Sequence, residues 1–304
     1  MEKLRQGNRG IIFKNLNPHI FILVLNWNGY HVLKHCLESL DKIQYNNFDT
    51  IVIDNGSNDA SCQMVFEKFP KVQLVKLEKN YGFSGGYNQV FQYLEKEKKP
   101  DYLMILNNDT IVKSDILNEF INAVKIYGNN KIYGAKIYYF DLPNRIWHAG
   151  GYIKLFMGLI YHRNNFLFHK NTAIDDIIVD YVTGCCIFVH WKTILNLNGF
   201  DENFNMYGED VDFCVRGKKL SYESILVQSA ILWHRVSASY GGHYSMRKWN
   251  KKQIAKIKLI RKHLDKKKWP IAALIFVLIF ISELVLYFSL NIFQSIMAII
   301  RYRK

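Results

Sequence analysis

Three neighbouring polar residues follow an apolar run near residue 105. Residues 103–106 (LMIL) are apolar, and Asn107, Asn108 and Asp109 come directly after them. Such a run is typical of a buried strand that delivers polar side chains to one edge of a sheet. Amide and carboxylate oxygens are ligands that a hard cation such as Mg or Mn prefers. The alternative is an ordinary Asx turn, because Asn and Asp also favour turns.

A second candidate for chemistry is the acidic pair Glu209 and Asp210. The pair opens a segment with helical spacing, and the dipole at a helix start stabilises a carboxylate. A carboxylate held beside a bound substrate can take the proton from an attacking hydroxyl, as general-base catalysis requires. The alternative is helix capping together with an i,i+4 ion pair between Asp212 and Arg216.

His234 and a glycine-rich segment complete the set of candidate groups. His234 ends a strand-like segment, and neutral imidazole is a good ligand for Mn-like ions, although a lone histidine is more often structural. Residues 82–86 are rich in glycine and precede a helix, which places their backbone N–H groups to face a phosphate. A plain loop is the alternative for this segment.

Apolar runs alternate with helical patterns through the first half of the chain, which is the βαβ pattern of a mostly parallel sheet with helices on both faces. Strands are expected at residues 21–25, 50–53, 72–77 and 103–106. Polar turns follow these strands at 26–29, 54–59, 80–86 and 107–110. We expect the turns to gather at one edge of the sheet, where open α/β folds bind ligands.

The second half is less regular. Extended segments are expected at 131–140, 150–155, 180–190 and 224–233, and helices at 191–197 and 209–220. The segment 180–190 (DYVTGCCIFVH) contains small residues, which let another segment or a ligand approach closely.

The net charge of +14 is concentrated near the C-terminus. Residues 247–268 hold eleven basic residues and one acidic residue, and three further basic residues lie in 301–304. A duplex-binding domain is expected to carry its basic charge on its folded face, so this distribution argues against a nucleic-acid partner. Residues 246–268 are predicted to form a basic helix, which would be juxtamembrane because an apolar segment follows it.

An apolar segment follows the basic one. Residues 269–300 exceed the ~20 residues needed to span a bilayer, and their flanks favour the upstream basic cluster as cytoplasmic. A single tilted transmembrane helix is the first interpretation. Two re-entrant segments, an interfacial helix and a buried helix of a soluble protein are the alternatives. Glu283 is costly in lipid and needs a partner.

The cysteines and the two ends of the chain complete the domain prediction. The five cysteines are odd in number and have no CxxC spacing, which argues against a zinc site and a disulfide framework. Free thiols fit a reducing, cytoplasmic setting. We expect an N-terminal tail over 1–17, one α/β domain over 18–245, and a membrane-associated segment over 269–304 behind the basic helix.

The order of these signals is more specific than any one of them. They are LNWNG at 25–29, DNGSNDAS at 54–61, NYGFSGGYNQ at 80–89, LNNDT at 106–110 and GFDENFNMYGEDVDFCVR at 199–216. Over residues 20–240 this series resembles the family-2 inverting glycosyltransferases, in particular the bacterial rhamnosyltransferase-like group. The resemblance implies a GT-A fold, in which a Rossmann-like nucleotide-binding half is fused to an acceptor half.

The resemblance also implies roles for residues that would bind the donor. Asp54 would contact the pyrimidine base, and the turn at Asn26, Trp27 and Asn28 would line the nucleotide pocket. Further residues would lie along the donor, namely Asn80, Gly85, Gly86, Asn88 and Asn108.

The implied metal site and catalytic base use the acidic groups described first. Asp109 would be the retained metal ligand of the family's DxD position, and His234 would help to hold the metal and the diphosphate. Asn107 replaces the first acid of that motif, which lowers the charge of the site. Asp210, in the pair with Glu209, matches the catalytic base. The cofactor implied is Mg or Mn.

Together, these features favour a membrane-associated glycosyltransferase of cell-surface polysaccharide synthesis. It would move a sugar, with rhamnose as a candidate, from a nucleotide diphosphate sugar to a lipid-linked saccharide, with its catalytic domain on the cytoplasmic side of the cell membrane. A nucleotidyltransferase is disfavoured because residues 80–89 contain no Lys or Arg to hold a triphosphate. A scaffold that binds nucleotide sugar without turnover is disfavoured by the retained Asp109, Asp210 and His234.

Overall fold

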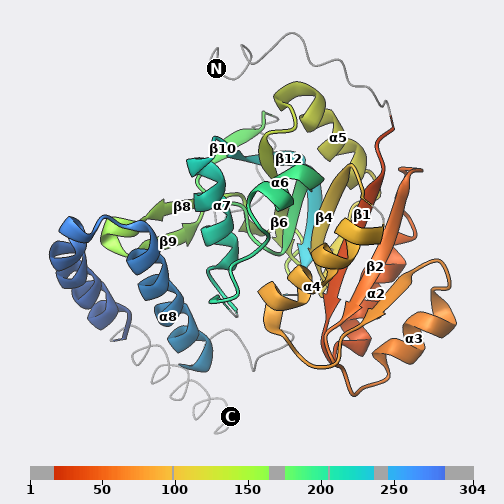
Figure 1. Ribbon diagram of the computed structural model, residues 1–304, viewed down its shortest axis with the longest axis horizontal. Helices are drawn as coiled ribbons and strands as arrows, with labels where there is room; N and C mark the ends of the chain where they lie inside the picture. Colours follow the sequence, from red (N-terminus) through yellow and green to blue (C-terminus); the bar gives the residue numbers. More distant parts are fainter. Residues whose placement is uncertain (1–16, 98, 164–174, 205, 236–245, 285–304) are drawn as a thin grey trace, which may run out of the picture.

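A large mixed sheet forms the centre of the protein (Figure 1). The computed structural model describes residues 17–97, 99–163, 175–204, 206–235 and 246–284. The main strand order is β10-β12-β6-β11-β4-β1-β2-β3. In chain order these strands are β1 (Ile20–Asn26), β2 (Phe48–Asp54), β3 (Gln73–Lys76), β4 (Tyr102–Asn107), β6 (Lys131–Tyr139), β10 (Ile177–Val179), β11 (Cys186–His190) and β12 (Glu223–His234).

The remaining strands are short. β5 (Thr110–Val112) pairs with β12, and β7 (Ile146–His148) pairs with β6. β8 (Gly151–Lys154) and β9 (Leu159–His162) form a separate two-stranded sheet, joined by the 3-10 turn η1 (Leu155–Met157).

The direction of the strands confirms the predicted α/β fold with a mostly parallel central sheet. β3, β2, β1 and β4 are mutually parallel, and β6 is parallel to β12. β11 runs antiparallel between β4 and β6. The parallel half consists of β1 to β4, the four strands that the sequence predicted to alternate with helices. This alternation is expected because parallel neighbours need a crossover connection.

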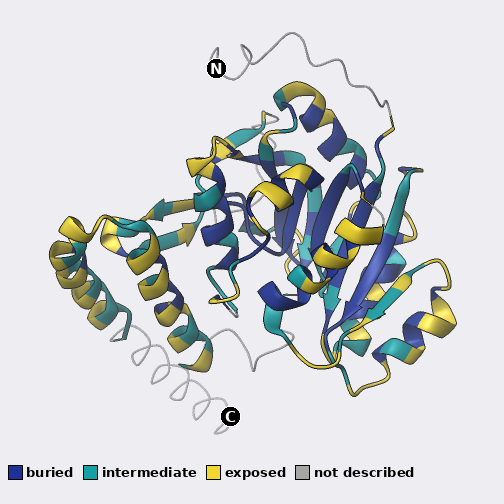
Figure 2. Cartoon of the chain, viewed as in Figure 1, coloured by how far each residue is buried: buried dark blue, intermediate teal, exposed yellow. Residues whose placement is uncertain are grey.

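Helices cover both faces of this sheet. One face packs against α2 (Tyr30–Leu40), α3 (Ser61–Lys68) and α5 (Ile116–Tyr127), and the other against α4 (Gly82–Glu97), α6 (Trp191–Asn196) and α7 (Glu209–Lys219). Alternate β1 residues serve the two cores, because side chains of a strand point to opposite faces: Ile22 and Val24 to one, Phe21 and Leu23 to the other. Figure 2 shows the central strands almost entirely buried.

The register brings the polar ends of three strands together. Asn26 at the end of β1 lies opposite Asp54 at the end of β2, and Leu25 lies opposite Asn107 at the end of β4. The strands are parallel, so these ends meet at one edge, as the sequence predicted.

Two local predictions were wrong. Residues 180–190 were expected to form one strand, but β11 begins only at Cys186, and the preceding residues leave the sheet and approach α7. The glycine-rich residues 82–86 were expected to be a turn, but α4 begins at Gly82 and includes them. In both places glycine or small residues allow close packing rather than an open loop.

The C-terminal region contains helix α8 (Met246–His263), the 3-10 turn η2 (Lys266–Lys268) and a further helix over 269–284. The predicted basic helix over 246–268 thus consists of α8 and η2. Within the described ranges no helix is long and apolar enough to cross a bilayer, so the predicted transmembrane helix has no support there. Residues 285–304 of that prediction lie outside the described part of the chain.

Phe188 tests the central packing. Its ring is buried on β11, stacked on Phe120 at 4.8 Å between centroids and on Tyr102 at 5.2 Å. Phe188→Ala should lower the free energy of unfolding by about 3–5 kcal/mol, because it removes buried contacts and leaves a cavity. Urea denaturation measures this change. Phe66→Ala, on an exposed ring of α3, is the control and should change it by less than about 0.5 kcal/mol.

Candidate active site

Asn26 is buried at the end of β1 and connects the loops that follow β1, β2 and β4. Its Oδ1 accepts a hydrogen bond from Asn108 Nδ2 at 2.7 Å, and its Nδ2 donates to Ser57 Oγ at 3.4 Å. A Cβ at Gly29 would lie 2.3 Å from Asn108 Nδ2, so only glycine leaves room for this pair. The amides predicted to contact the donor therefore tie the ends of β1 and β4 together.

Asp54 has the properties of a binding residue. Its side chain is buried, and Oδ2 accepts a hydrogen bond from Ser57 N at 3.1 Å. Oδ1 is buried and forms no hydrogen bond within the described structure. The pKa of the nearby Cys62 thiol is raised to about 11, first by burial and then by Asp54. A buried acceptor of this kind needs a donor, and an N–H of a pyrimidine base would supply one.

The loop after β1 is locked to the loop after β2. Asn28, with a left-handed φ of 50°, accepts from Asn58 N through Oδ1 at 2.8 Å and donates through its backbone to Ser57 Oγ at 2.9 Å. Trp27 between them is about half exposed and is free to cover a ligand. These contacts hold the predicted nucleotide-lining turn in one conformation.

Asn55 is a structural residue of the site that the sequence reasoning missed. Its Nδ2 donates to Asn80 Oδ1 at 3.1 Å and to Gly82 O at 3.0 Å, and its Oδ1 accepts from Tyr81 N. Asn80 Oδ1 also accepts from Gly82 N at 2.8 Å. The start of α4 is thereby fixed to the end of β2, beside Asp54.

The glycines of α4 serve close packing. A Cβ at Gly86 would lie 2.6 Å from Leu25 Cδ1, and a Cβ at Gly85 would lie 3.0 Å from Tyr81 Cβ. A larger residue at position 86 would push α4 away from β1, and one at position 85 would crowd Tyr81. Their predicted contact with the donor stays a prediction.

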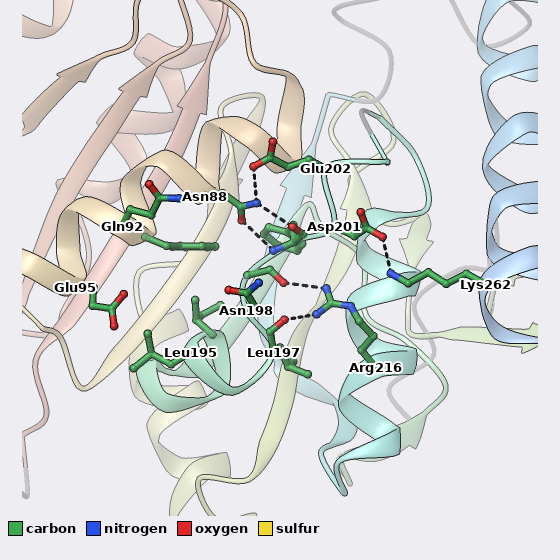
Figure 3. A pocket seen from close by; sticks show the side chains of 14 residues that line it. Asn88, Gln92, Glu95, Leu195, Leu197, Asn198, Asp201, Glu202, Arg216 and Lys262 are labelled. Atoms are coloured by element: carbon green, nitrogen blue, oxygen red, sulfur yellow. Dashed lines mark hydrogen bonds and ion pairs between the residues drawn. The ribbon is translucent and has the colours of Figure 1, made fainter.

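Asn88 of α4 binds the loop over residues 199–202. Its Nδ2 donates to Phe200 O at 2.8 Å and to Glu202 Oε1 at 3.0 Å, and its Oδ1 accepts from Phe200 N at 2.9 Å (Figure 3). The Asn88 amide thus holds the 199–202 loop in place, and its predicted contact along the donor stays a prediction. The adjoining pocket of about 620 Å³ is lined by none of the predicted catalytic or metal-binding residues.

Asp109 and His234 meet where β5 pairs with β12. Thr110 lies opposite His234 in that ladder, and His234 Nε2 lies 3.1 Å from Asp109 Oδ1. Both side chains are about nine-tenths buried. The described residues contain no cluster of three or more His, Cys, Asp or Glu able to hold a metal. Mg is commonly held by one or two carboxylates and by substrate phosphates, so this pair fits a cation shared with a diphosphate.

A group of aromatic and histidine side chains surrounds His234 and was not found from the sequence. The Trp147 ring lies 4.5 Å from the His234 ring and 4.9 Å from the His162 ring, and His162 lies 4.7 Å from His148. Burial lowers the pKa of His162 to about 4 and that of His148 well below its ordinary value. These imidazoles are therefore neutral at pH 7.

Asp210 is positioned by two backbone N–H groups. Gly184 N donates to Oδ2 at 2.9 Å and Val211 N donates to Oδ1 at 2.8 Å. Burial nevertheless raises the pKa of Asp210, and burial together with the charge of Asp210 raises that of Glu209 well above its ordinary value. A raised pKa gives the Asp210 carboxylate a greater affinity for a proton, which suits a general base.

Residues 184–185 connect Asp210 to the edge of the sheet at which β1, β2 and β4 end. Asn107 N donates to Cys185 O at 3.0 Å, while the adjacent Gly184 binds Asp210. The pKa of Cys185 is raised well above its ordinary value by burial, with smaller contributions from Asp109 and Asp210. The structure therefore brings the predicted metal ligand and the predicted base to the same side of the sheet as Asp54.

The start of α7 is held by an ion-pair network. The predicted pair forms, with Arg216 Nε at 2.7 Å from Asp212 Oδ2. Asp212 also contacts Lys262 Nζ at 2.6 Å and His263 Nε2 at 2.7 Å, both from α8. Lys262 further binds Asp201 at 2.5 Å. The basic C-terminal helix thus helps to position the helix that carries Asp210.

Comparison with known proteins identifies the class. Residues 21–192 match the model of glycosyl transferase family 2, and the chain belongs to this family. The resemblance to this family that the sequence motifs indicated is confirmed.

The similar sequences include rhamnosyltransferases. Over 235 residues the chain is 25% identical to rhamnosyltransferase WbbL of Escherichia coli K12, covering 74% of this chain and 83% of the relative. It is 24% identical over 228 residues to N-acetylglucosaminyl-diphospho-decaprenol L-rhamnosyltransferase of Mycobacterium tuberculosis, covering 69% and 73%.

Solved structures share the fold. GalNAc-T7 with UDP, GalNAc and Mn2+ aligns with a TM-score of 0.64 at 13% identity, covering 84% of this chain and 49% of that one. A mannosyltransferase of Pyrobaculum calidifontis with GDP-Man and Mn2+ aligns at 0.58 and 14% identity, covering 84% and 68%. These similarities support the GT-A architecture.

Asp212 makes the stability of the protein depend on pH. Burial alone would raise its pKa, but hydrogen bonds from His263, Lys262 and Arg216 outweigh burial and lower the pKa from 3.8 to about 2. Because the folded-state pKa is depressed, this stabilisation is present above about pH 4 and is lost as the pH falls towards 2. The shift corresponds to about 2 kcal/mol.

Asp212→Asn should therefore lower the free energy of unfolding at pH 7 by about 3 kcal/mol, since it removes the charged partner of Arg216 and leaves Lys262 with Asp201 alone. The difference from wild type should shrink between pH 4 and pH 2. Urea denaturation across this range measures both effects, with Asp41→Asn on an exposed carboxylate as the control. A difference that did not change with pH would contradict the assignment.

Proposed function

We propose that this glycosyltransferase is inverting and cation-dependent, and that it uses Asp210 as the base. The proposal depends on one observation, the gathering of Asp54, Asp109 and Asp210 at one edge of the sheet through the β1–β2–β4 register and the Gly184–Asp210 bond. Asp54 would recognise the nucleobase of the donor, Asp109 would bind a cation, and Asp210 would accept a proton.

Each of these residues has a separate role in the proposed reaction. Asp54 and the Asn26–Asn28 turn bind the nucleotide of the donor. A divalent cation held by Asp109 and His234 would offset the charge that develops on the departing diphosphate. Asn107 lies beside them without a charge, so the cation would be shared with the diphosphate and bound weakly in its absence. Asp210 removes the proton of the acceptor hydroxyl, whose oxygen then attacks the anomeric carbon from the face opposite the diphosphate.

For the substrates, we propose a sugar donor with a pyrimidine diphosphate and a saccharide acceptor carried on a lipid. Rhamnose is the first candidate for the sugar because two similar proteins are named as rhamnosyltransferases, and one of these names includes a diphospho-decaprenol acceptor. The product would be an extended chain in cell-surface polysaccharide synthesis.

For the location, we propose the cytoplasmic side of the cell membrane. The support is the basic cluster over 247–268 followed by the apolar segment from residue 269. Positioning the enzyme and a lipid-linked acceptor on one surface lowers the entropic cost of their meeting.

Asp210→Asn tests the base. Donor binding should remain unchanged while kcat falls by about 10²–10⁴, because the amide cannot accept the acceptor proton. In the wild type, the raised pKa of Asp210 should place the acid limb of kcat/KM above 3.8, with activity rising as the carboxylate loses its proton. Donor affinity by calorimetry and initial rates across pH measure these effects. Asp41→Asn is the control, and a variant with wild-type turnover would remove Asp210 from this role.

Asp109→Ala tests the cation site. In the wild type, Mn should tighten binding of a nucleotide diphosphate, and this gain should fall at least about tenfold in the variant because the carboxylate ligand is missing. Calorimetric titration of dTDP and UDP with and without Mn measures the gain without turnover. Asp141→Ala, at an exposed position, should behave like wild type. Equal gains in both variants would exclude Asp109 as a ligand.

A further inference from the structure

The last described part of the chain forms a helical hairpin, which we call the C-terminal hairpin (residues 246–284). Trp269 Nε1 donates to Leu264 O next to the turn. At the other end, Glu283 accepts hydrogen bonds from Trp249, Gln253 and Lys256 of α8, at 3.2, 2.7 and 2.8 Å. Contacts at both ends show that helix 269–284 runs antiparallel along α8.

The inner side of the C-terminal hairpin is bound to the catalytic domain. Leu259 of α8 is buried in the same core as α4 and α7. Lys258 Nζ donates to Asn203 O at 2.6 Å, and Lys262 and His263 bind Asp212 as described above. These contacts fix the face of α8 that points towards the catalytic domain and leave its opposite face exposed.

The outer side carries an apolar stripe. On helix 269–284 the exposed positions recur at intervals of three and four residues, which places them on one face. They are Ile271, Leu274, Val277, Leu278 and Ile281, and Ile254 and Ile257 of α8 are also exposed. Leu274 and Leu278 are 63% and 61% exposed. A stripe of large apolar residues on a solvent-exposed surface marks an interaction site, because contact of these side chains with water is unfavourable.

Basic residues lie beside this stripe. The turn between the helices contains Lys266, Lys267 and Lys268, all exposed, and Arg261 is exposed on the last turn of α8. The only acidic residue in the turn is Asp265, whose carboxylate caps η2 by accepting from Lys267 N. An apolar face flanked by lysines is the pattern of a helix that lies in a bilayer interface and attracts anionic lipid headgroups.

We propose that the C-terminal hairpin docks on the surface of an anionic lipid bilayer, with the stripe in the interface and helix 269–284 lying in the membrane plane. The contacts of Glu283 support this orientation. A perpendicular insertion of residues 269–284 would either break these contacts or carry the charges of α8 into the hydrocarbon. This inference rests on the membrane location proposed above and specifies its surface and orientation.

The experiment measures binding of the full chain to vesicles, without turnover. Wild type should co-sediment with vesicles of phosphatidylethanolamine and phosphatidylglycerol, and less with neutral phosphatidylcholine. The double variant Leu274→Glu/Leu278→Glu should reduce the partition coefficient for the anionic vesicles at least about tenfold, because it removes apolar area from the interface. Phe66→Glu, at an exposed ring on α3, is the matched control and should bind like wild type. Wild-type binding by the double variant would overturn the proposal.

Two further measurements separate the alternatives. Replacing Lys266, Lys267 and Lys268 by Gln should reduce the preference for anionic over neutral vesicles, and an unchanged preference would contradict the charge argument. Light scattering after size exclusion reports whether the stripe instead joins two copies: a wild-type dimer that the double variant dissociates, with vesicle binding unchanged, would overturn the proposal.

Catalysis is assayed separately with a water-soluble acceptor. The double variant should keep wild-type turnover in that assay, since its substitutions lie on the outer face. Vesicle binding by a wild-type chain that transfers no sugar would leave the docking surface standing and reject the proposed function.

Discussion

The parallel hydrogen-bonded register of β1 with β2 and β4 is the constraint on which the site depends. It places Asn26 opposite Asp54 and Leu25 opposite Asn107, so three polar strand ends share one edge. The partly buried hydrogen bond between Asn108 and Asn26 then joins the loop that follows β4 to the end of β1. A shift of one residue would exchange the two faces of a strand and bury its polar end residue in a hydrophobic core.

The proposed base, Asp210, reaches this edge by a different route. Asp210 belongs to a helix on the sheet face, and its carboxylate is bound by Gly184, in a segment that leaves the sheet just before β11. On the far side of α7, Asp212 is bound by Lys262 and His263 of the C-terminal hairpin. Helix α7 is thus held at one side by the segment that precedes β11 and at the other by the hairpin that carries the proposed membrane surface.

Much of the fold could be predicted because its signals are local. The apolar runs that became β1, β2 and β4 each end in polar residues, and the amphipathic spacing of α2 and α5 is complete within the segment. The prediction for residues 180–190 was wrong because their small and apolar residues are compatible with a strand and also with a turn that leaves the sheet. The environment of Asn88 was also hidden, since its partners Phe200 and Glu202 lie more than a hundred residues away.

The sequence alone determined the family, the order of the motifs and the residue types able to bind a cation or accept a proton, because these are properties of short segments read in order. Tertiary structure alone decided that Asp109 pairs with His234, that burial raises the pKa of Asp210, and that Glu283 finds its partners on α8. These outcomes depend on distance, burial and desolvation between segments far apart in the chain, and no local pattern encodes them.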